Sequence, residues 1–175
     1  MIEPDSEKLS PVAESRAQAT LREYLEASEQ LDPVRAAACF ADDAEILGPE
    51  GRFAGRASID AYLRWSLSRL SSASMQPLGD GARVVGDVAR VVGDVAVEEF
   101  VQSGISVQGF RFETTRCAIT EFDAEGKIRR RSTYWDRWPL IFQTAHQTGG
   151  LSGRMARSFV DKVDQNLTVD MLNSQ

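Results

Sequence analysis

Hydrophobic and polar residues alternate with a helical period in the first part of the chain and with a period of two in the second. Between residues 14 and 30 the apolar positions include Ala17, Leu21 and Leu25, and glutamates occupy the remaining faces. Residues three or four positions apart share one face of a helix. The pattern therefore predicts an amphipathic helix over residues 14–30.

A short helix and a short strand are predicted next. Asp32 followed by Pro33 is typical of a helix start, because the aspartate can cap the helix and proline suits its first position. This helix is expected to run through Phe40. Residues 44–47 then have the character of a short strand, which glycines and a proline end.

A third helix is predicted after this strand. Its apolar face carries Ile59, Leu63, Leu67 and Leu70, which follow one another at helical spacing. The serines within residues 71–74 are expected to end the helix.

The sequence up to residue 136 then predicts an antiparallel sheet. It begins with a repeat, since residues 82–88 and 89–95 both read ARVVGDV. A period of seven sends equivalent side chains to opposite faces of a flat strand, so at least one Gly-Asp pair is expected to form a turn or a bulge. Turns at Ser103-Gly104 and at residues 123–126 would separate three strands of a meander, over residues 95–102, 110–122 and 127–136.

Helices followed by such a sheet predict an α+β fold, with the helices packed on one face of the sheet. We expect this domain to span residues 14–145, with the apolar residues 138–143 lying across the sheet. Residues 1–13 are polar and include prolines, which predicts a disordered extension. Residues 146–175 have a weak helical pattern and are expected to form a partly helical tail.

Charge and hydropathy narrow the range of partners. A net charge of −6 argues against a nucleic-acid-binding surface. No apolar stretch reaches the roughly 18 residues that a membrane-spanning helix needs, so no membrane is expected as a partner. The start, MIEPDSEKLS, lacks the basic-then-apolar layout of a signal peptide, and we expect a cytoplasmic protein.

Nothing in the sequence indicates a cofactor or a metal. Cys39 and Cys117 are too few for a disulfide framework or a zinc site. The sole histidine, His146, lies beyond the expected core without further ligands around it. The glycines form no phosphate-binding loop.

Three stretches resemble known families. The segments YLEASEQLDPVRAAACFADDAEILGP, GRASIDAYL and GKIRRRSTYWD are similar to the SnoaL-like polyketide cyclases and the ketosteroid-isomerase-like proteins. The resemblance covers roughly residues 17–143. It implies the cone-shaped nuclear transport factor 2-like fold, a pocket inside the cone, and a homodimer.

The residues at the families' catalytic positions argue against their best-known reactions in this protein. Tyr24 matches the tyrosine that donates to the enolate oxygen in ketosteroid isomerases, but the proton-shuttling carboxylate falls on Gly48 and the second donor on Ala118. The cyclase aspartate falls near Thr133. The Asp-Arg-Asp set of limonene epoxide hydrolases falls on Val101, Glu99 and Thr133.

By the same resemblance, one face of each strand lines the cone. The residues expected to point inward are Val95, Val97, Glu99, Val101, Arg116, Ala118, Arg131, Thr133 and Trp135. A shift of one residue would exchange the two faces of a strand. Glu99 is then a candidate general acid–base, or else the partner of Arg116 or Arg131 in a structural ion pair.

Three further side chains are candidates for binding charge. Arg116 and Arg131 could hold a ligand carboxylate, enolate or phenolate, because a guanidinium offers a planar fork of donors. Tyr24 could donate a hydrogen bond to the ligand, or could cap the core from the first helix.

Apolar and aromatic residues are expected to complete the pocket. Trp65 and Trp135 are core or rim residues, or else the walls of an aromatic-lined site together with Leu63, Val101, Ala118 and Thr133.

Two functions remain open from the sequence. The first is a cofactor-free enzyme that isomerises, cyclises or dehydrates an apolar cyclic or polyketide-like molecule, with Glu99 moving the proton and Arg116, Arg131 and Tyr24 stabilising the oxyanion. The second is a non-catalytic module that binds a small molecule or serves dimerisation.

Overall fold

The computed structural model describes residues 16–78, 83–85, 95–150, 153–158 and 161 of the chain. Several sequence predictions therefore lie outside the described residues. They are the extension at residues 1–13, most of the repeat at residues 82–95 and most of the tail at residues 146–175.

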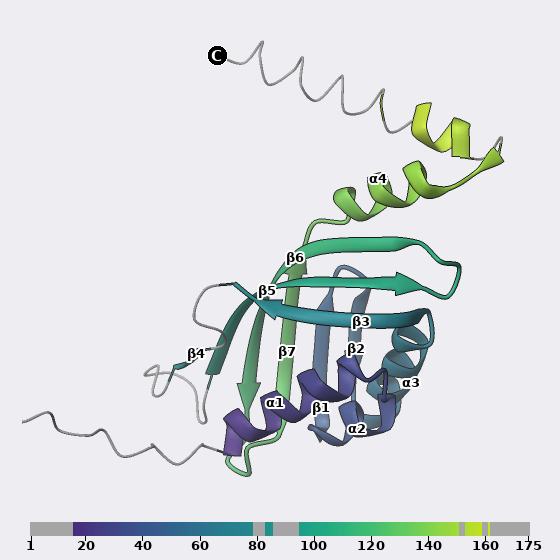
Figure 1. Ribbon diagram of the computed structural model, residues 1–175. Helices are drawn as coiled ribbons and strands as arrows, with labels where there is room; N and C mark the ends of the chain where they lie inside the picture. Colours follow the sequence, from purple (N-terminus) through teal and green to yellow (C-terminus); the bar gives the residue numbers. More distant parts are fainter. Residues whose placement is uncertain (1–15, 79–82, 86–94, 151–152, 159–160, 162–175) are drawn as a thin grey trace, which may run out of the picture.

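Three helices cover the concave face of a curved sheet (Figure 1). They are α1 (Arg16–Glu29), α2 (Pro33–Ala38) and α3 (Arg56–Leu67). The predicted apolar faces of α1 and α3 are buried against the sheet, which confirms the predicted α+β layout. The Asp32 carboxylate caps α2 by accepting hydrogen bonds from two backbone amides at 3.0 Å.

The strands form one sheet in the order β2-β1-β7-β6-β5-β3, with β4 paired to β5. Only the β1–β7 pair is parallel among these described strands. The predicted meander is confirmed as β5, β6 and β7. The strands are β1 (Phe40–Gly48), β2 (Gly51–Ala54), β3 (Leu70–Pro77), β4 (Arg83–Val85), β5 (Val95–Ser106), β6 (Arg111–Phe122) and β7 (Ile128–Trp135).

The serines at residues 71–74 do not merely end α3, as the sequence suggested. They belong to β3, which pairs antiparallel with β5 through Ser72↔Ile105 and Ser74↔Ser103. Gly104 is likewise not a turn but an interior residue of β5. A Cβ at Gly104 would overlap the Ser72 carbonyl oxygen, so only glycine allows the two strands to approach this closely.

The first copy of the repeat is described only at β4, which pairs antiparallel with β5. Arg83 pairs with Val97, and Val85 pairs with Val95, which is the last residue of the second copy. The turn or bulge predicted at the Gly-Asp pairs lies outside the described residues.

The inward face of β5 is the opposite of the one predicted. Glu98 is 3% exposed and Phe100 6%, whereas Glu99 is exposed and Val97 is 42% exposed. The register explains the reversal: Glu98 lies opposite the fully buried Ala118, and so shares its face of the sheet. The predicted inward faces of β6 and β7 are confirmed.

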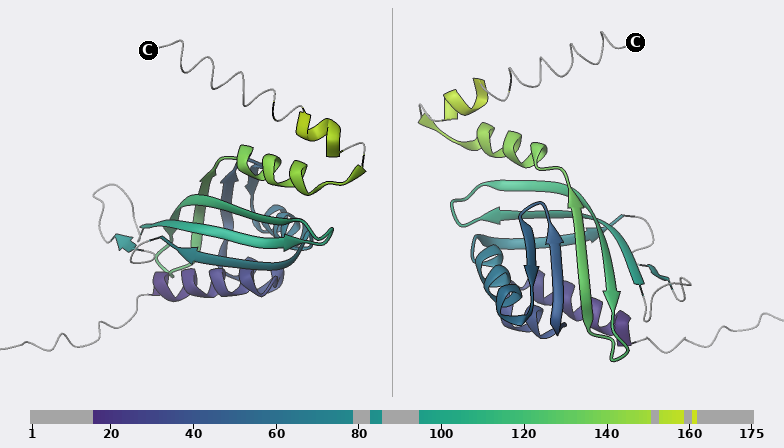
Figure 2. Two further views of the ribbon diagram at one scale, coloured as in Figure 1. Left: turned by 45° about the horizontal axis from the view of Figure 1, so that its top comes forward. Right: turned by 180° about the vertical axis from the view of Figure 1, so that it is seen from behind.

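Helix α4 (Trp138–Gln147) lies on the side of the sheet away from α1, beside β6 (Figure 2). The last residue pair in the register of β6 and β7 is Arg116 with Trp135, so the part of β6 that precedes Arg116 has no partner on β7. The Gln143 amide bonds both the N–H and the C=O of Glu113, each at 2.8 Å. Gln147 bonds the backbone of Arg111 in the same way, so α4 occupies the edge that β7 leaves open.

Gly126, in the β6–β7 turn, is a sensitive packing point. Its φ is 81°, and a Cβ there would lie 2.6 Å from the Cβ of Arg16 at the start of α1. Gly109, in the β5–β6 turn, has a similar φ of 85° but nothing within 4 Å of its would-be Cβ.

We expect Gly126→Ala to lower the free energy of unfolding by about 1–3 kcal/mol more than Gly109→Ala does, because only the former adds a steric clash to the backbone strain. Urea denaturation of the two variants measures the difference. Equal losses would show that α1 does not pack against this turn.

Candidate functional site

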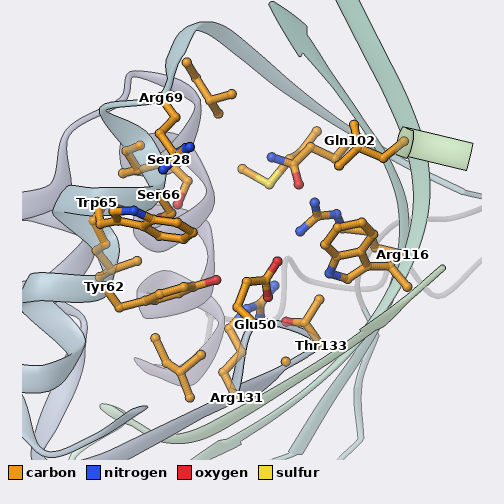
Figure 3. A pocket seen from close by; sticks show the side chains of 18 of the residues that line it. Ser28, Glu50, Tyr62, Trp65, Ser66, Arg69, Gln102, Arg116, Arg131 and Thr133 are labelled. Atoms are coloured by element: carbon orange, nitrogen blue, oxygen red, sulfur yellow. Dashed lines mark hydrogen bonds between the residues drawn. The ribbon is translucent and has the colours of Figure 1, made fainter. Parts of the chain in front are cut away.

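A cavity of about 320 Å³ lies between the helices and the inner face of the sheet. This volume is at the low end of the range for small-molecule sites, roughly 300–1,000 Å³, which favours a compact ligand. Helices α1 and α3 form one wall, and side chains of β5, β6 and β7 form the other (Figure 3).

A buried ion pair forms one side of the cavity wall. An Arg131 Nη atom lies 2.5 Å from an Oε atom of Glu98, and both side chains are 4% exposed. Thr120 accepts a hydrogen bond from Arg131 and donates one to Glu98 at 3.3 Å. The guanidinium lies 4.8 Å from the centre of the Tyr24 ring.

This cluster keeps Arg131 charged. Burial alone would lower the pKa of Arg131, but the attraction of Glu98 and the contact with Tyr24 outweigh it and raise that pKa above its usual value. Each charge is matched and hydrogen-bonded, as an ion pair inside a protein requires.

Arg116 is a second arginine in the wall, and it has no such partner. No carboxylate of the described residues lies within 4.0 Å of its guanidinium, which stacks 4.4 Å from the centre of the Trp135 indole ring. Burial lowers the pKa of Arg116, and Glu50 and the tyrosines Tyr62 and Tyr24 only partly oppose this effect. The Nε atom of Arg116 and the Nε1 atom of Trp135 are buried without a hydrogen-bond partner among the described residues.

Tyr62 brings a hydroxyl into the cavity from α3. Its ring stacks on Phe53 at 4.1 Å and lies 6.1 Å from Trp65 at the mouth. Burial, and then the nearby Glu50 carboxylate, raise the pKa of Tyr62 well above its usual value. The phenol therefore keeps its proton and can serve as a hydrogen-bond donor.

Glu50 contributes a carboxylate from the turn between β1 and β2. In Figure 3 it lies between the Tyr62 hydroxyl and the Arg116 guanidinium. A Cβ built on Gly48 would lie 3.1 Å from Oε2 of Glu50. The absence of a side chain at Gly48 thus leaves space for this carboxylate.

Comparison with known proteins assigns the family. The SnoaL-like domain model matches residues 21–131, well over half of the chain. The protein belongs to the SnoaL-like domain family. No curated protein matches the sequence.

Solved structures show the same fold as this SnoaL-like protein, with TM-scores of 0.57–0.59. An NTF2-like protein from Burkholderia pseudomallei is 18% identical and aligns over 73% of this chain and 96% of its own. A protein with a ketosteroid isomerase-like fold from Catenulispora acidiphila, in complex with trimethylamine, is 16% identical over 71% and 90%. An LEH-like epoxide hydrolase from M. tuberculosis is 19% identical over 73% and 88%. These likenesses confirm the predicted nuclear transport factor 2-like fold.

Most of the side chains that the sequence placed in the pocket line the cavity of the SnoaL-like domain. They are Tyr24, Leu63, Trp65, Arg116, Arg131, Thr133 and Trp135. Trp65 is 49% exposed and lies at the mouth, with the Arg69 guanidinium 4.9 Å from its ring centre.

Three of the predicted residues do not line it. Glu99 and Val101 belong to the outer face of β5, and the prediction that they point inward is wrong. Ala118 is on the inner face, as predicted, but is fully buried behind the cavity wall.

The sequence did not predict three of the site residues, which are Glu98, Glu50 and Tyr62. Arg131 on the inner face predicts a buried glutamate on β5, but this requirement does not distinguish Glu98 from Glu99. No comparable signal marks Glu50, since a glutamate between a proline and a glycine is ordinary in a surface turn.

Among the described residues, no cluster of three histidine, cysteine, aspartate or glutamate side chains comes together as a metal site would require. Burial raises the pKa of the Cys39 thiol to about 11, which makes it a poor nucleophile. None of the helices in this part of the chain is long and apolar enough to cross a membrane.

We expect Glu98→Gln to lower the free energy of unfolding by about 3–5 kcal/mol, because it leaves the Arg131 charge buried without a counter-charge. Glu99→Gln is the matched control on the exposed face and should change it by less than about 0.5 kcal/mol. Denaturant titration of both variants checks this. A larger loss for Glu99→Gln would contradict the assignment of the two faces.

Proposed function

We propose that the protein is a cofactor-free enzyme that isomerises, cyclises or dehydrates an apolar cyclic or polyketide-like substrate by general acid–base chemistry. Membership of the SnoaL-like family supports a small-molecule function. The observation that carries the proposal is the convergence of a carboxylate, a protonated phenol and an unpaired guanidinium on one small cavity. These groups are Glu50, Tyr62 and Arg116.

Glu50 takes the role of the base that the sequence analysis gave to Glu99. Glu99 faces away from the cavity, and Glu98 is held by Arg131 and Thr120. Glu50 lines the cavity with a solvent-exposed side chain and has no ion pair within 4.0 Å in the described chain, so its carboxylate is free to act as the base.

The proposed reaction begins at a carbon next to a substrate carbonyl. Glu50 removes a proton from this carbon, and the electron pair of the C–H bond moves to the carbonyl oxygen to give an enolate. Tyr62 donates a hydrogen bond to that oxygen, and the charge of Arg116 stabilises it. Arg131 and Tyr24 contribute more weakly, because Glu98 already neutralises Arg131.

The enolate then determines the product. Return of the proton from Glu50 to a different carbon completes an isomerisation. Expulsion of a hydroxyl from the next carbon, with that proton, completes a dehydration. Attack of the enolate carbon on a second carbonyl, followed by protonation of the new alkoxide, completes a cyclisation.

A non-catalytic binding module is the second candidate. One observation favours it. At the positions where the resemblance implies catalytic carboxylates, this chain has Gly48, Ala118 and Thr133, which carry no carboxylate. In that case the cavity would bind its ligand without changing it.

We further propose a cytoplasmic homodimer that joins through the outer face of the sheet. Val97 is 42% exposed and Tyr134 is 59% exposed on this face, which supports an apolar contact there.

Proton exchange tests the enzymatic proposal without knowledge of the natural substrate. In deuterium oxide, we expect the protein to accelerate the α-deuteration of some members of a panel of cyclic ketones and enones, followed by nuclear magnetic resonance. Glu50→Gln should reduce the rate by about 10²–10⁴-fold, since this is the usual contribution of a general base.

Glu99→Gln is the matched control, and this variant should catalyse the deuterium exchange at the wild-type rate. Undiminished exchange by Glu50→Gln would remove Glu50 from the mechanism. Absence of exchange across the panel would favour the binding module.

A further inference from the structure

Arg116 and Trp135 form an unsatisfied pair of donors in the cavity wall. They lie directly opposite each other on β6 and β7, and both side chains line the cavity. Neither Arg116 Nε nor Trp135 Nε1 has a hydrogen-bond partner among the described residues. An unsatisfied buried donor lowers stability, and more so when it is charged, so two adjacent ones call for an explanation.

The fold itself does not require these donors to stay unpaired. The neighbouring Arg131, on the same inner face, is fully matched by Glu98 and Thr120. A water molecule could satisfy an N–H group, but it could not neutralise the Arg116 charge. An anion satisfies both requirements at once.

The charge of the cavity points to the same kind of ligand. The whole chain carries a net charge of −6. Apart from tyrosines, however, the ionisable side chains that line the cavity are three arginines and one glutamate. They are Arg69, Arg116, Arg131 and Glu50. Because Glu98 neutralises Arg131, the lining retains an excess of one positive charge.

The remaining residues of the cavity wall favour a ligand that is flat and apolar. Tyr62 and Trp65 lie on one side of the cavity, and Phe100 lies beside Arg116 in the register of β5 and β6. Aromatic walls with one cationic point are suited to a ring system that carries a single acidic group.

We propose that the cavity binds a cyclic or aromatic carboxylic acid, whose carboxylate accepts hydrogen bonds from the Arg116 guanidinium and the Trp135 indole N–H. The terminal nitrogens of Arg116 already face the cavity in Figure 3, and the long side chain can turn off the indole to admit the carboxylate. The guanidinium has five N–H donors, so one edge can hold the carboxylate while the other supports a reacting carbonyl oxygen.

This assignment deepens the proposed function and rests on it in one respect, namely that the acid is the substrate of that site. The carboxylate would anchor the ring and hold its reacting carbon near Glu50. Anchoring of this kind sets the geometry of proton transfer.

Binding of a carboxylate probe and its neutral counterpart tests the proposal. We expect 2-naphthoate to bind the full-length protein at least about 10-fold more tightly than 2-naphthamide by isothermal titration calorimetry, since a charge-assisted hydrogen bond contributes this much or more. Arg116→Gln should abolish the preference. Trp135→Phe, which keeps a ring but removes the N–H, should weaken the naphthoate about 3- to 10-fold.

Two controls make the result specific. Arg64→Gln removes an exposed cation of α3 that does not line the cavity, and it should change naphthoate affinity by less than about 3-fold. Unchanged affinity of each variant for 2-naphthamide shows that the cavity is still folded. Equal binding of the two probes by the wild-type protein, or a preference that survives Arg116→Gln, overturns the proposal.

The outcomes separate this proposal from the enzymatic one. Glu50→Gln should retain or strengthen the preference for naphthoate while it loses deuterium exchange. Exchange without a carboxylate preference would contradict only the carboxylate site. A carboxylate preference without exchange would contradict only the proposed catalysis.

Discussion

The ion pair between Glu98 and Arg131 is the constraint on which the inner face of the sheet depends. It connects β5 to β7 across β6, where Thr120 bonds both partners, and the Tyr24 ring of α1 lies against it. Two charges can be buried together only if their geometry is good and their remaining donors are matched. A shift of one residue in β5 would turn Ala96, Glu98 and Phe100 outward, and only one of its two directions would give Arg131 another carboxylate, that of Glu99.

The two inner-face arginines differ in what surrounds them. Arg131 is surrounded by protein groups that match its charge and its donors. Arg116, on the adjacent strand, contacts an aromatic ring but no carboxylate within 4.0 Å among the described residues. A matched buried arginine contributes to the fold, whereas an unmatched one lowers stability and is retained where a ligand needs it. This difference is the physical basis for assigning Arg116, rather than Arg131, to ligand binding.

Glu50 shows how the turn between β1 and β2 supplies the cavity with a carboxylate that has no ion pair within 4.0 Å among the described residues. Gly48 has no side chain, and the carboxylate of Glu50 occupies the adjacent space. In the proposed mechanism Glu50 accepts a proton and the protonated Tyr62 donates a hydrogen bond. Glu50 lies beside Gly48, the position at which the resemblance to ketosteroid isomerases implies the proton-shuttling carboxylate.

The sequence was sufficient for the fold because the helix signals are local. The apolar face of α1, the Asp32 cap and the turn at Gly126 each depend on a few neighbouring residues, and each is found as expected. The face of β5 could not be predicted in this way. Each face carries one of the two glutamates, but the outward positions also carry valines, such as the exposed Val97, so hydrophobicity favours the wrong face.

Strand β3 and the site residues Glu50 and Tyr62 illustrate a second limit. A serine-rich segment is a strand here because its backbone pairs with β5 beside Gly104, a contact between distant parts of the chain. Glu50 and Tyr62 meet only after β1, β2 and α3 have packed. Contacts of this kind depend on tertiary structure and leave no periodic pattern in the sequence.

The free energies of unfolding of Arg131→Met and Arg116→Met, measured under identical conditions, test the difference between the two arginines most directly. We expect Arg131→Met to lose about 3–5 kcal/mol, because it leaves Glu98 buried without its partner. We expect Arg116→Met to lose nothing or to become more stable, because it removes a partly buried charge that has no carboxylate within 4.0 Å among the described residues. A loss for Arg116→Met as large as that for Arg131→Met would show that Arg116 is a structural residue, and would contradict its assignment to the ligand.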